Sequence, residues 1–257
     1  MVRMASGGDD TYRYPDVNDH ITLTLIDQCE IPPGVWEDQE STVLAGVDEV
    51  LRQGPLRRLL DYGSGGGRLA VRFADTFESV TSFEPDPDRA QLQREFLATR
   101  PQGRRIRVVE DPSDAGADFD VVLCSHVIQH VPHAMADSVL HDVSTRVARG
   151  GFAVILTTLS PRSTPVFVLN YVTEDGRAVE DEVSADTFEA ALRTRSIGVL
   201  PIRFFPFDVL VADLDRLGMD TVTAFGFHGN SGVVGPTTVT SPELLRCRDM
   251  VLVTRRR

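Results

Sequence analysis

Short apolar runs alternate with amphipathic stretches along most of the chain, which is the pattern of strands alternating with helices. Several of these runs are nearly continuous, as in strands that are buried on both faces of a parallel sheet. The predicted strands cover residues 56–60, 80–85, 105–111, 118–126, 149–158, 221–227 and 247–255. The predicted helices cover residues 37–52, 69–74, 87–99, 133–148 and 207–217. The pattern therefore predicts an α/β fold.

The alternation is interrupted after the fifth predicted strand, between residues 160 and 206. This segment has a hairpin signal at Glu174-Asp175-Gly176 and a short helix with Ser184 as its N-cap. Its strands are predicted at residues 166–172, 178–183 and 200–206. We therefore expect an insertion in the main fold. Farther along, residues 229–242 are rich in Gly, Ser and Thr and are predicted to form a loop.

A glycine loop, residues 63–67, separates the first predicted strand from the helix that follows it. Glycine adopts positive φ and has no Cβ, so a ligand can approach the backbone closely, and a helix N-terminus offers N–H groups to a negative group. A phosphate-binding loop would need Gly-Lys-Ser/Thr, and the chain contains no lysine. Arg68 stands where the dinucleotide fingerprint G-x-G-x-x-G requires its third glycine. The loop thus indicates a nucleotide-like cofactor of another kind.

Two acids flank this loop in the sequence. Asp61 closes the strand before it, and Glu84 ends the second predicted strand, about 20 residues past the loop. A carboxylate at that spacing is placed to accept both hydroxyl groups of a ribose, because its two oxygens take two donors. NAD-binding domains share this spacing, so it indicates a nucleoside without choosing one.

The pattern acidic-x-Gly-x-Gly-x-Gly, filled by Asp61, Gly63, Gly65 and Gly67, resembles motif I of the class I S-adenosylmethionine (SAM) dependent methyltransferases. The run Phe119-Asp120-Val121-Val122 and the predicted glycine turn Gly150-Gly151, which opens the segment of the fifth strand, are similar to later parts of that family. The resemblance covers residues 55–158. It implies SAM as the cofactor and a Rossmann-like, seven-stranded, mostly parallel sheet. It also implies an antiparallel last strand, helices on both faces and an inserted substrate cap.

The resemblance also assigns residues to the cofactor site. It implies that Asp61 lies near the amino group of the SAM methionine moiety, that the glycine loop curls under the cofactor, and that Glu84 binds the ribose. The acid ending the third strand is expected to contact the adenine amino group; Asp111 aligns best with it, and Glu110 is the rival. The expected cofactor-binding residues are Asp61, Gly63, Gly65, Gly67, Glu84, Asp111 and Ser125.

The residues directly after the fourth strand are expected beside the transferred methyl group. An oxygen or carbon acceptor often needs a base near neutral pH, which suits histidine. We expect His126 to be the catalytic base, with His130 as the second candidate. Together with His133 these histidines are spaced like metal ligands, but no cluster of acids supports them, so we expect no metal.

Two segments are expected to shape the acceptor pocket. The N-terminal lid would contribute Tyr14 and His20, and the insertion would form a cap that contributes Phe167 and Tyr171. These side chains could instead only pack their segments onto the core. The expected divisions are 1–54 for the lid, 55–159 for the SAM-binding core, 160–206 for the cap and 207–257 for the rest of the core sheet.

Charge and composition narrow the range of partners. The formal net charge of −12 over 257 residues disfavours nucleic acid, because phosphate contacts need a basic surface. We find neither an apolar run of about 18 residues nor a signal peptide. The three cysteines are too scattered for a disulfide framework. We expect a cytoplasmic, bacterial protein, monomeric or homodimeric, with a small-molecule partner and no membrane.

The sequence therefore predicts transfer of a methyl group from SAM to an oxygen, nitrogen or carbon atom of a small molecule in secondary metabolism. A SAM-binding protein without transfer activity, such as a cyclase or an inactive partner, is one alternative, and a protein methyltransferase is another. Methylation of nucleic-base amino groups is disfavoured because no Asn/Asp-Pro-Pro-Tyr/Phe motif follows the fourth strand. A dinucleotide dehydrogenase is disfavoured by Arg68.

Overall fold

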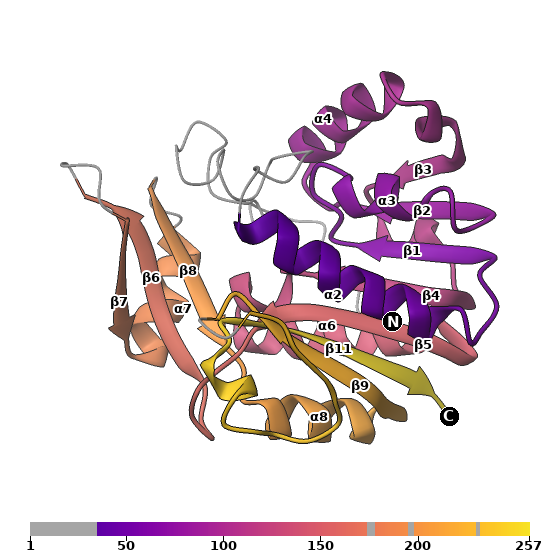
Figure 1. Cartoon of the computed structure of the whole chain (residues 1–257). Coiled ribbons are helices and arrows are strands. Elements are labelled where there is room, and N and C mark those ends of the chain that lie inside the picture. The colour runs from indigo at the N-terminus through magenta and orange to yellow at the C-terminus, as the bar shows by residue number, and fades with distance from the viewer. Residues whose placement is uncertain (1–34, 174–177, 195–197, 230–231) are drawn as a thin grey trace.

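A computed structural model describes residues 35–173, 178–194, 198–229 and 232–257. Its main feature is an 8-stranded sheet with the order β10-β9-β11-β5-β4-β1-β2-β3 (Figure 1). Strands β1 to β5 are parallel, whereas β11 runs antiparallel to both of its neighbours, β5 and β9. The strands are β1 (Arg58–Tyr62), β2 (Ser79–Phe83), β3 (Ile106–Val109), β4 (Phe119–Ser125), β5 (Val147–Thr158), β9 (Met219–Phe227), β10 (Val234–Thr237) and β11 (Asp249–Arg256).

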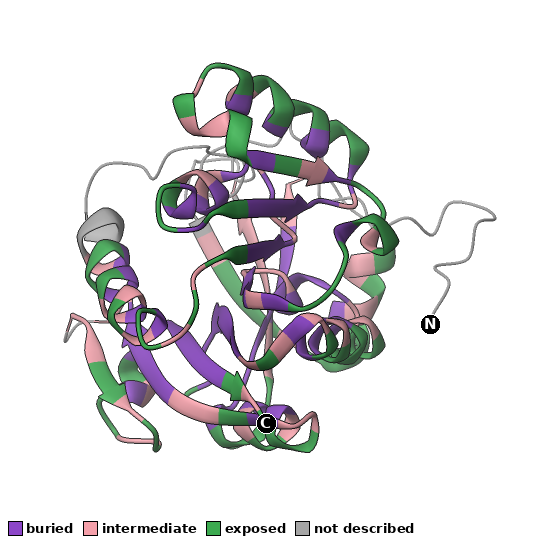
Figure 2. Ribbon diagram, turned by 90° about the vertical axis from the view of Figure 1, so that its right-hand side faces the viewer, coloured by how far each residue is buried: buried purple, intermediate pink, exposed green. Residues whose placement is uncertain are grey.

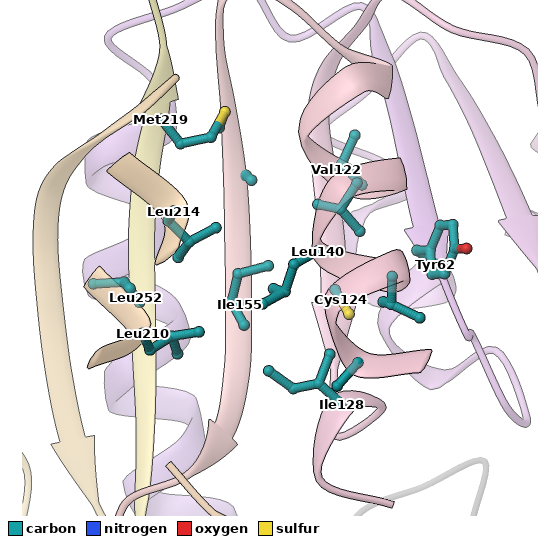
Figure 3. Packing of buried hydrophobic residues seen from close by; sticks show 14 of the residues in the cluster. Tyr62, Val122, Cys124, Ile128, Leu140, Ile155, Leu210, Leu214, Met219 and Leu252 are labelled. Carbon is teal, nitrogen blue, oxygen red and sulfur yellow. The ribbon is translucent and has the colours of Figure 1, made fainter. Parts of the chain in front are cut away.

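Helices cover both faces of this sheet because successive strand residues point to opposite faces. Val121 and Leu123 of β4 belong to one apolar cluster with α2 and α3, while Val122 and Cys124 belong to the other, with α6 and α8. Figure 3 shows part of the second cluster, and Figure 2 shows that exposed residues lie mainly on the outer faces of the helices. The helices are α2 (Val35–Leu51), α3 (Arg68–Phe73), α4 (Pro87–Ala98), α5 (Pro112–Ala115), α6 (His133–Arg146) and α8 (Phe207–Arg216), with 3₁₀ turns η1 (Pro101–Arg105), η2 (Ile128–His130) and η3 (Leu244–Arg246).

The predicted Rossmann-like, mostly parallel sheet with an antiparallel last strand is confirmed, with an eighth strand added to the seven predicted and with local differences at element ends. Residues 234–237, predicted as loop, form β10, a short strand that pairs antiparallel with β9 at the sheet edge. The helix predicted over 133–148 ends at Arg146, and the glycine pair lies inside β5. There Gly150 has a φ of 77°, and a Cβ on Gly151 would lie 2.7 Å from the Asp120 carbonyl oxygen. The pair therefore makes a bulge where β5 shifts its register against β4.

A second, 3-stranded antiparallel sheet has the order β7-β6-β8 and comes from the predicted insertion. The predicted hairpin and extended piece are thus confirmed as β6 (Val166–Val172), β7 (Ala178–Val183) and β8 (Val199–Phe204), with α7 (Ala185–Thr194) packed against them. The chain leaves the end of β5 and returns there, because the Phe205 N–H donates to the Thr158 carbonyl (3.0 Å) and the Ser160 N–H to the Phe205 carbonyl (2.8 Å). The second sheet therefore stands beyond the carboxyl ends of the parallel strands (Figure 1).

No helix in the described part of the chain combines the length and the apolar character needed to cross a bilayer. The free cysteines of this part, Cys124 and Cys247, are both buried. The division of the chain at residues 54, 159 and 206 stays a prediction.

Candidate active site

The glycine loop lies between the carboxyl end of β1 and α3. Gly63, Gly65 and Gly67 have φ of 73°, 54° and 84°, the left-handed region that favours glycine. A Cβ on Gly65 would lie 2.6 Å from Arg89 Nη2, and one on Gly67 would lie 2.5 Å from Gln93 Nε2. Both neighbours are buried residues of α4, so a side chain at Gly65 or Gly67 would clash with this helix.

The carboxyl group of Asp61 lies at the end of β1, immediately before this loop. The residue is only 2% exposed, and its Oδ2 has no hydrogen-bond partner among the described residues. Burial raises the pKa of Asp61 to about 7, against the opposing effects of a hydrogen bond from the Ala70 backbone and the charge of Arg68. A cationic ligand group would stabilise the ionised carboxylate here. The site therefore fits the amino group of a methionine moiety.

Glu84 follows β2 and connects it to the glycine loop. Its Oε2 accepts a hydrogen bond from the Gly65 N–H (2.8 Å), and its Oε1 accepts one from the Asp86 N–H (3.1 Å). Burial raises the pKa of this carboxyl, and the nearby charge of Arg89 opposes the rise. Each carboxylate oxygen can accept a further donor, so Glu84 fits a pair of ribose hydroxyl groups.

Asp111 lies two residues beyond β3 and caps α5. Its carboxylate accepts hydrogen bonds from the Ser113 backbone N–H (2.7 Å) and hydroxyl (2.6 Å), and these bonds lower the pKa of Asp111. The rival acid Glu110 pairs with Arg94 (2.6 Å) in an exposed ion pair. Asp111 thus contacts Ser113 of its own turn and Glu110 contacts α4, and the adenine role of Asp111 stays a prediction.

The end of β4 and the segment after it bring Ser125 and His126 to the same edge as the loop. A Cβ on Gly63 would lie 2.4 Å from Val127 Cγ2, so this segment covers the loop directly. His126 has a left-handed φ of 54°, and its Nδ1 lies 2.7 Å from the Gln129 side-chain amide nitrogen. Burial lowers the pKa of His126. The amide donates to Nδ1, so His126 is neutral with its proton on Nε2.

His130 contacts the second sheet. Its Nδ1 lies 2.9 Å from the Pro201 carbonyl oxygen on β8, and burial lowers the pKa of His130 to about 4. This histidine therefore donates to β8 as a neutral ring, and a catalytic role for it stays a prediction. His133 begins α6 with an exposed side chain. Among the described residues, no group of three or more His, Cys, Asp and Glu side chains is arranged to hold a metal ion.

The residues expected to contact substrate are not brought together by the contacts described. Phe167 packs against Phe188 of α7 (ring centroids 5.1 Å apart), and the Tyr171 hydroxyl donates to Asp181 (2.5 Å) on the neighbouring strand β7. Both contacts stabilise the second sheet itself. Tyr14 and His20 lie outside the described residues.

One pair at this edge escaped the sequence analysis. His228 directly follows β9, and its Nδ1 lies 2.7 Å from Asp249 Oδ2 at the start of β11. No short motif links the two residues. The signal that could have found them is topological: an antiparallel last strand starts at the edge where the parallel strands end, so its first residue meets the residue after β9.

A nucleoside that carries a methionine moiety fits both features of this site. Its amino group can pair with the buried carboxylate of Asp61, and its remaining part can lie against the glycine loop beside it. The mostly parallel sheet with β11, its last strand, inserted antiparallel between β5 and β9 is in keeping with the antiparallel last strand that the class I resemblance implies. Fold and site thus define a SAM-dependent methyltransferase. Residues 35–195, more than half of the chain, match the family model of the methyltransferase domain, and the chain belongs to this family.

Curated relatives match part of the chain. The ubiquinone biosynthesis O-methyltransferase of Xanthomonas campestris pv. campestris (strain B100) is 31% identical over 121 residues, which are 46% of this chain and 49% of that protein. The protein of the same name from Methylobacterium nodulans is 35% identical over 75 residues, 28% of this chain and 30% of that protein. The chain spans half the length of such relatives or less.

Solved structures share the fold over most of the chain. The CcbJ methyltransferase from Streptomyces caelestis has a TM-score of 0.61 at 16% identity and covers 91% of this chain and 98% of its own. The glycopeptide N-methyltransferase MtfA, solved in complex with SAM, has a TM-score of 0.54 at 22% identity and covers 85% and 92%. These likenesses establish the fold, and with the family match they confirm the predicted class and its cofactor.

Proposed function

We propose that this chain transfers a methyl group from SAM to a small-molecule acceptor. The observation that carries the proposal is Asp61, a buried carboxylate whose Oδ2 has no hydrogen-bond partner among the described residues. A carboxylate in such surroundings favours a cationic partner. The amino group of the SAM methionine moiety supplies one.

The residues around the glycine loop would hold the cofactor in complementary ways. Asp61 would accept from the amino group, the loop would let the ligand approach the backbone, and Glu84 would accept from the ribose hydroxyl groups. When bound, SAM supplies an electrophilic methyl group on a sulfonium sulfur. Methyl transfer is an in-line displacement, so the chain has to align the acceptor and exclude water.

We assign the acceptor to the space between the glycine loop and the second sheet. The second sheet starts from the end of β5, and His130 ties it to the segment that covers the loop. Arg203 of β8 adds a hydrogen bond to the Val131 carbonyl (3.1 Å). A small-molecule acceptor is also in keeping with the solved 1,6-didemethyltoxoflavin N1-methyltransferase of Burkholderia thailandensis, which has this fold at 19% identity and a TM-score of 0.53.

Calorimetry with S-adenosylhomocysteine (SAH), the product of SAM, tests the cofactor site. We expect SAH to bind and NAD not to bind, and we expect Asp61→Ala and Glu84→Ala to abolish SAH binding. At about a hundredfold over its Kd, SAH should raise the free energy of unfolding by ~2.7 kcal/mol. Asp75→Ala, which removes an exposed acid, is the matched control. Binding of NAD instead of SAH would contradict the cofactor assignment.

Transfer itself is tested with SAM that carries a labelled methyl group. The protein is incubated with phenols, amines and activated carbon acids as acceptors, and both labelled product and SAH are measured. Equal amounts of the two are expected. SAH binding without transfer to any acceptor would support a SAM-binding protein that does not methylate.

A further inference from the structure

The pair His228 and Asp249 lies at the functional edge of the main sheet and is not used by the cofactor site. Because β11 is antiparallel to β9 and β5, its first residue, Asp249, is level with Phe227 and Thr158, where those strands end. The Nδ1 of His228 is 2.7 Å from Asp249 Oδ2, and the two side chains are only 8% and 3% exposed.

The hydrogen bond fixes the tautomer of this histidine. An ionised carboxylate only accepts hydrogen bonds, so the Nδ1 of His228 carries the hydrogen that is shared with Asp249. In the neutral ring Nε2 then carries the lone pair. The pair therefore presents a ring nitrogen that can accept a proton, with a carboxylate behind it that stabilises the resulting cation.

The backbone holds His228 in a conformation that the rest of the fold imposes. Its φ is 56°, a left-handed value that L-residues seldom adopt, and its N–H donates to Gln39 Oε1 of α2 (2.6 Å). His126 at the end of β4 has a similar φ of 54°. Strained backbone conformations cluster at functional sites, so two histidines with this conformation at one sheet edge indicate a functional site there.

The dyad contributes to the electrostatic environment of His126, the residue that directly follows β4. The charges of Asp249, Glu40, Arg68 and His228 all act on His126. Glu40 of α2 and Arg68 of α3 form a bidentate pair (2.8 and 3.1 Å), so they offset each other. His126 carries its proton on Nε2 and is a hydrogen-bond donor there, which leaves the proton-accepting nitrogen to His228.

We propose that His228, oriented by Asp249, is the general base of the proposed methyl transfer, and that the acceptor is a hydroxyl compound. The inference rests on the proposed function. As the acceptor oxygen forms its bond to the methyl carbon, the O–H proton passes to Nε2 of His228. The bond from that carbon to sulfur breaks, and its electron pair stays on sulfur. The imidazolium then returns the proton to solvent.

Two substitutions separate catalysis from structure. His228→Asn keeps an amide that can donate to Asp249, and asparagine tolerates a left-handed φ, but it has no nitrogen lone pair to accept a proton. Asp249→Asn keeps the shape and removes the charge that fixes the tautomer. His141→Asn, on the exposed side of α6, is the matched control.

Three measurements are made on wild type and variants. ¹⁵N NMR of histidine-labelled protein reports the tautomer, calorimetry reports SAH affinity, and labelled SAM reports transfer to a panel of phenols. We expect the Nδ1–H tautomer at His228 and its loss in Asp249→Asn. We also expect unchanged SAH affinity in His228→Asn, with transfer lowered at least ~100-fold.

Each contrary result has a distinct meaning. An Nε2–H tautomer at His228, or full transfer by His228→Asn, would overturn the dyad while the proposed function stands. A wild type that binds SAH and methylates amines but none of the phenols would overturn the hydroxyl acceptor and the base with it. Methylation of carbon acids alone would overturn the hydroxyl acceptor. Failure of wild type to bind SAH would instead overturn the proposed function.

Discussion

The ligand-free fold and the proposed cofactor favour different protonation states of Asp61. Burial favours the protonated carboxyl, whereas an amino group of the cofactor would favour the carboxylate. Burial raises the pKa of this carboxyl from 3.8 to about 7, so the folded state holds its proton more tightly than the unfolded chain does. Stability is then fully present below the unfolded value and is lost as pH rises through the folded value. Asp61→Asn should therefore raise the free energy of unfolding of the ligand-free protein at about pH 8, by at most about 4 kcal/mol. Urea denaturation at about pH 4 and pH 8 measures the difference.

The same substitution should remove SAH binding, because the uncharged amide no longer pairs with an amino group. A variant that is more stable and still binds SAH as tightly as wild type would contradict the placement of the amino group. Parallel pH curves for wild type and variant would contradict the buried, proton-binding carboxyl.

Gly67 is required both by its backbone angle and by its contact with α4. Gly67→Ala should lower the free energy of unfolding by about 2 kcal/mol, from left-handed strain and from the clash with Gln93. Gly218→Ala is the matched control, because Gly218 has a similar φ of 80° and nothing within 4 Å of its added Cβ. Only Gly67→Ala should also weaken SAH binding in calorimetry. Equal effects of the two variants on stability and binding would contradict the close packing of the loop.

At the scale of single residues, the sequence predicted those site residues that lie in short motifs. Asp61, the loop glycines and Glu84 lie in short motifs, and the structure brings them together at one strand edge. His228 follows β9 and Asp249 begins β11, and their contact exists only because β11 enters the sheet antiparallel. Local sequence patterns do not predict such a contact between residues that are far apart in the chain.

Among the elements, β8 is fastened to the segment after β4 by the buried side chain of Arg203. The guanidinium donates to the Val131 carbonyl and lies 5.4 Å from the ring centroids of Phe188 and Phe205. Arg203→Met should lower the free energy of unfolding by about 2–3 kcal/mol, because the carbonyl loses its donor in a buried site. Urea unfolding measures the loss. Arg162→Met, which removes an exposed arginine paired with Glu182 in the same sheet, should change little.

There are physical reasons why the sequence pattern did not predict some elements correctly. Residues 234–237 include Gly235 and Pro236, which disfavour strand formation, and β10 forms only as an edge strand where proline is tolerated. The glycine pair of β5 was predicted to be a turn because a bulge and a turn need the same residue type. Asp111 ended the predicted third strand, but the strand stops at Val109 and Asp111 starts a helix turn.

Across the whole molecule, the insertion was predicted as strands but its attachment was not. That attachment includes backbone bonds between Thr158, Ser160 and Phe205 and the side chains of His130 and Arg203. Phe167, predicted to line the acceptor pocket, packs against Phe188 of this unit, and its role toward substrate stays a prediction. An amphipathic pattern indicates that an aromatic side chain is shielded from solvent. Whether it packs against a neighbouring element or lines a ligand pocket depends on how the elements are arranged.

This attachment should make the stability of the entire chain depend on acid through His130. Burial lowers the pKa of His130 from 6.5 to about 4, so stability is present above the unfolded value and is lost as pH falls toward the folded one. Asp61 acts in the opposite direction in the same pH range, so wild type alone would hide the effect. The comparison therefore uses Asp61→Asn as background and adds His130→Asn, whose amide can still donate to the Pro201 carbonyl. Between about pH 7 and pH 4, the added substitution should remove a loss of up to about 3 kcal/mol. The exposed change His141→Asn is the control, and identical urea curves with and without His130→Asn would show that this ring does not link the two sheets in the way its geometry indicates.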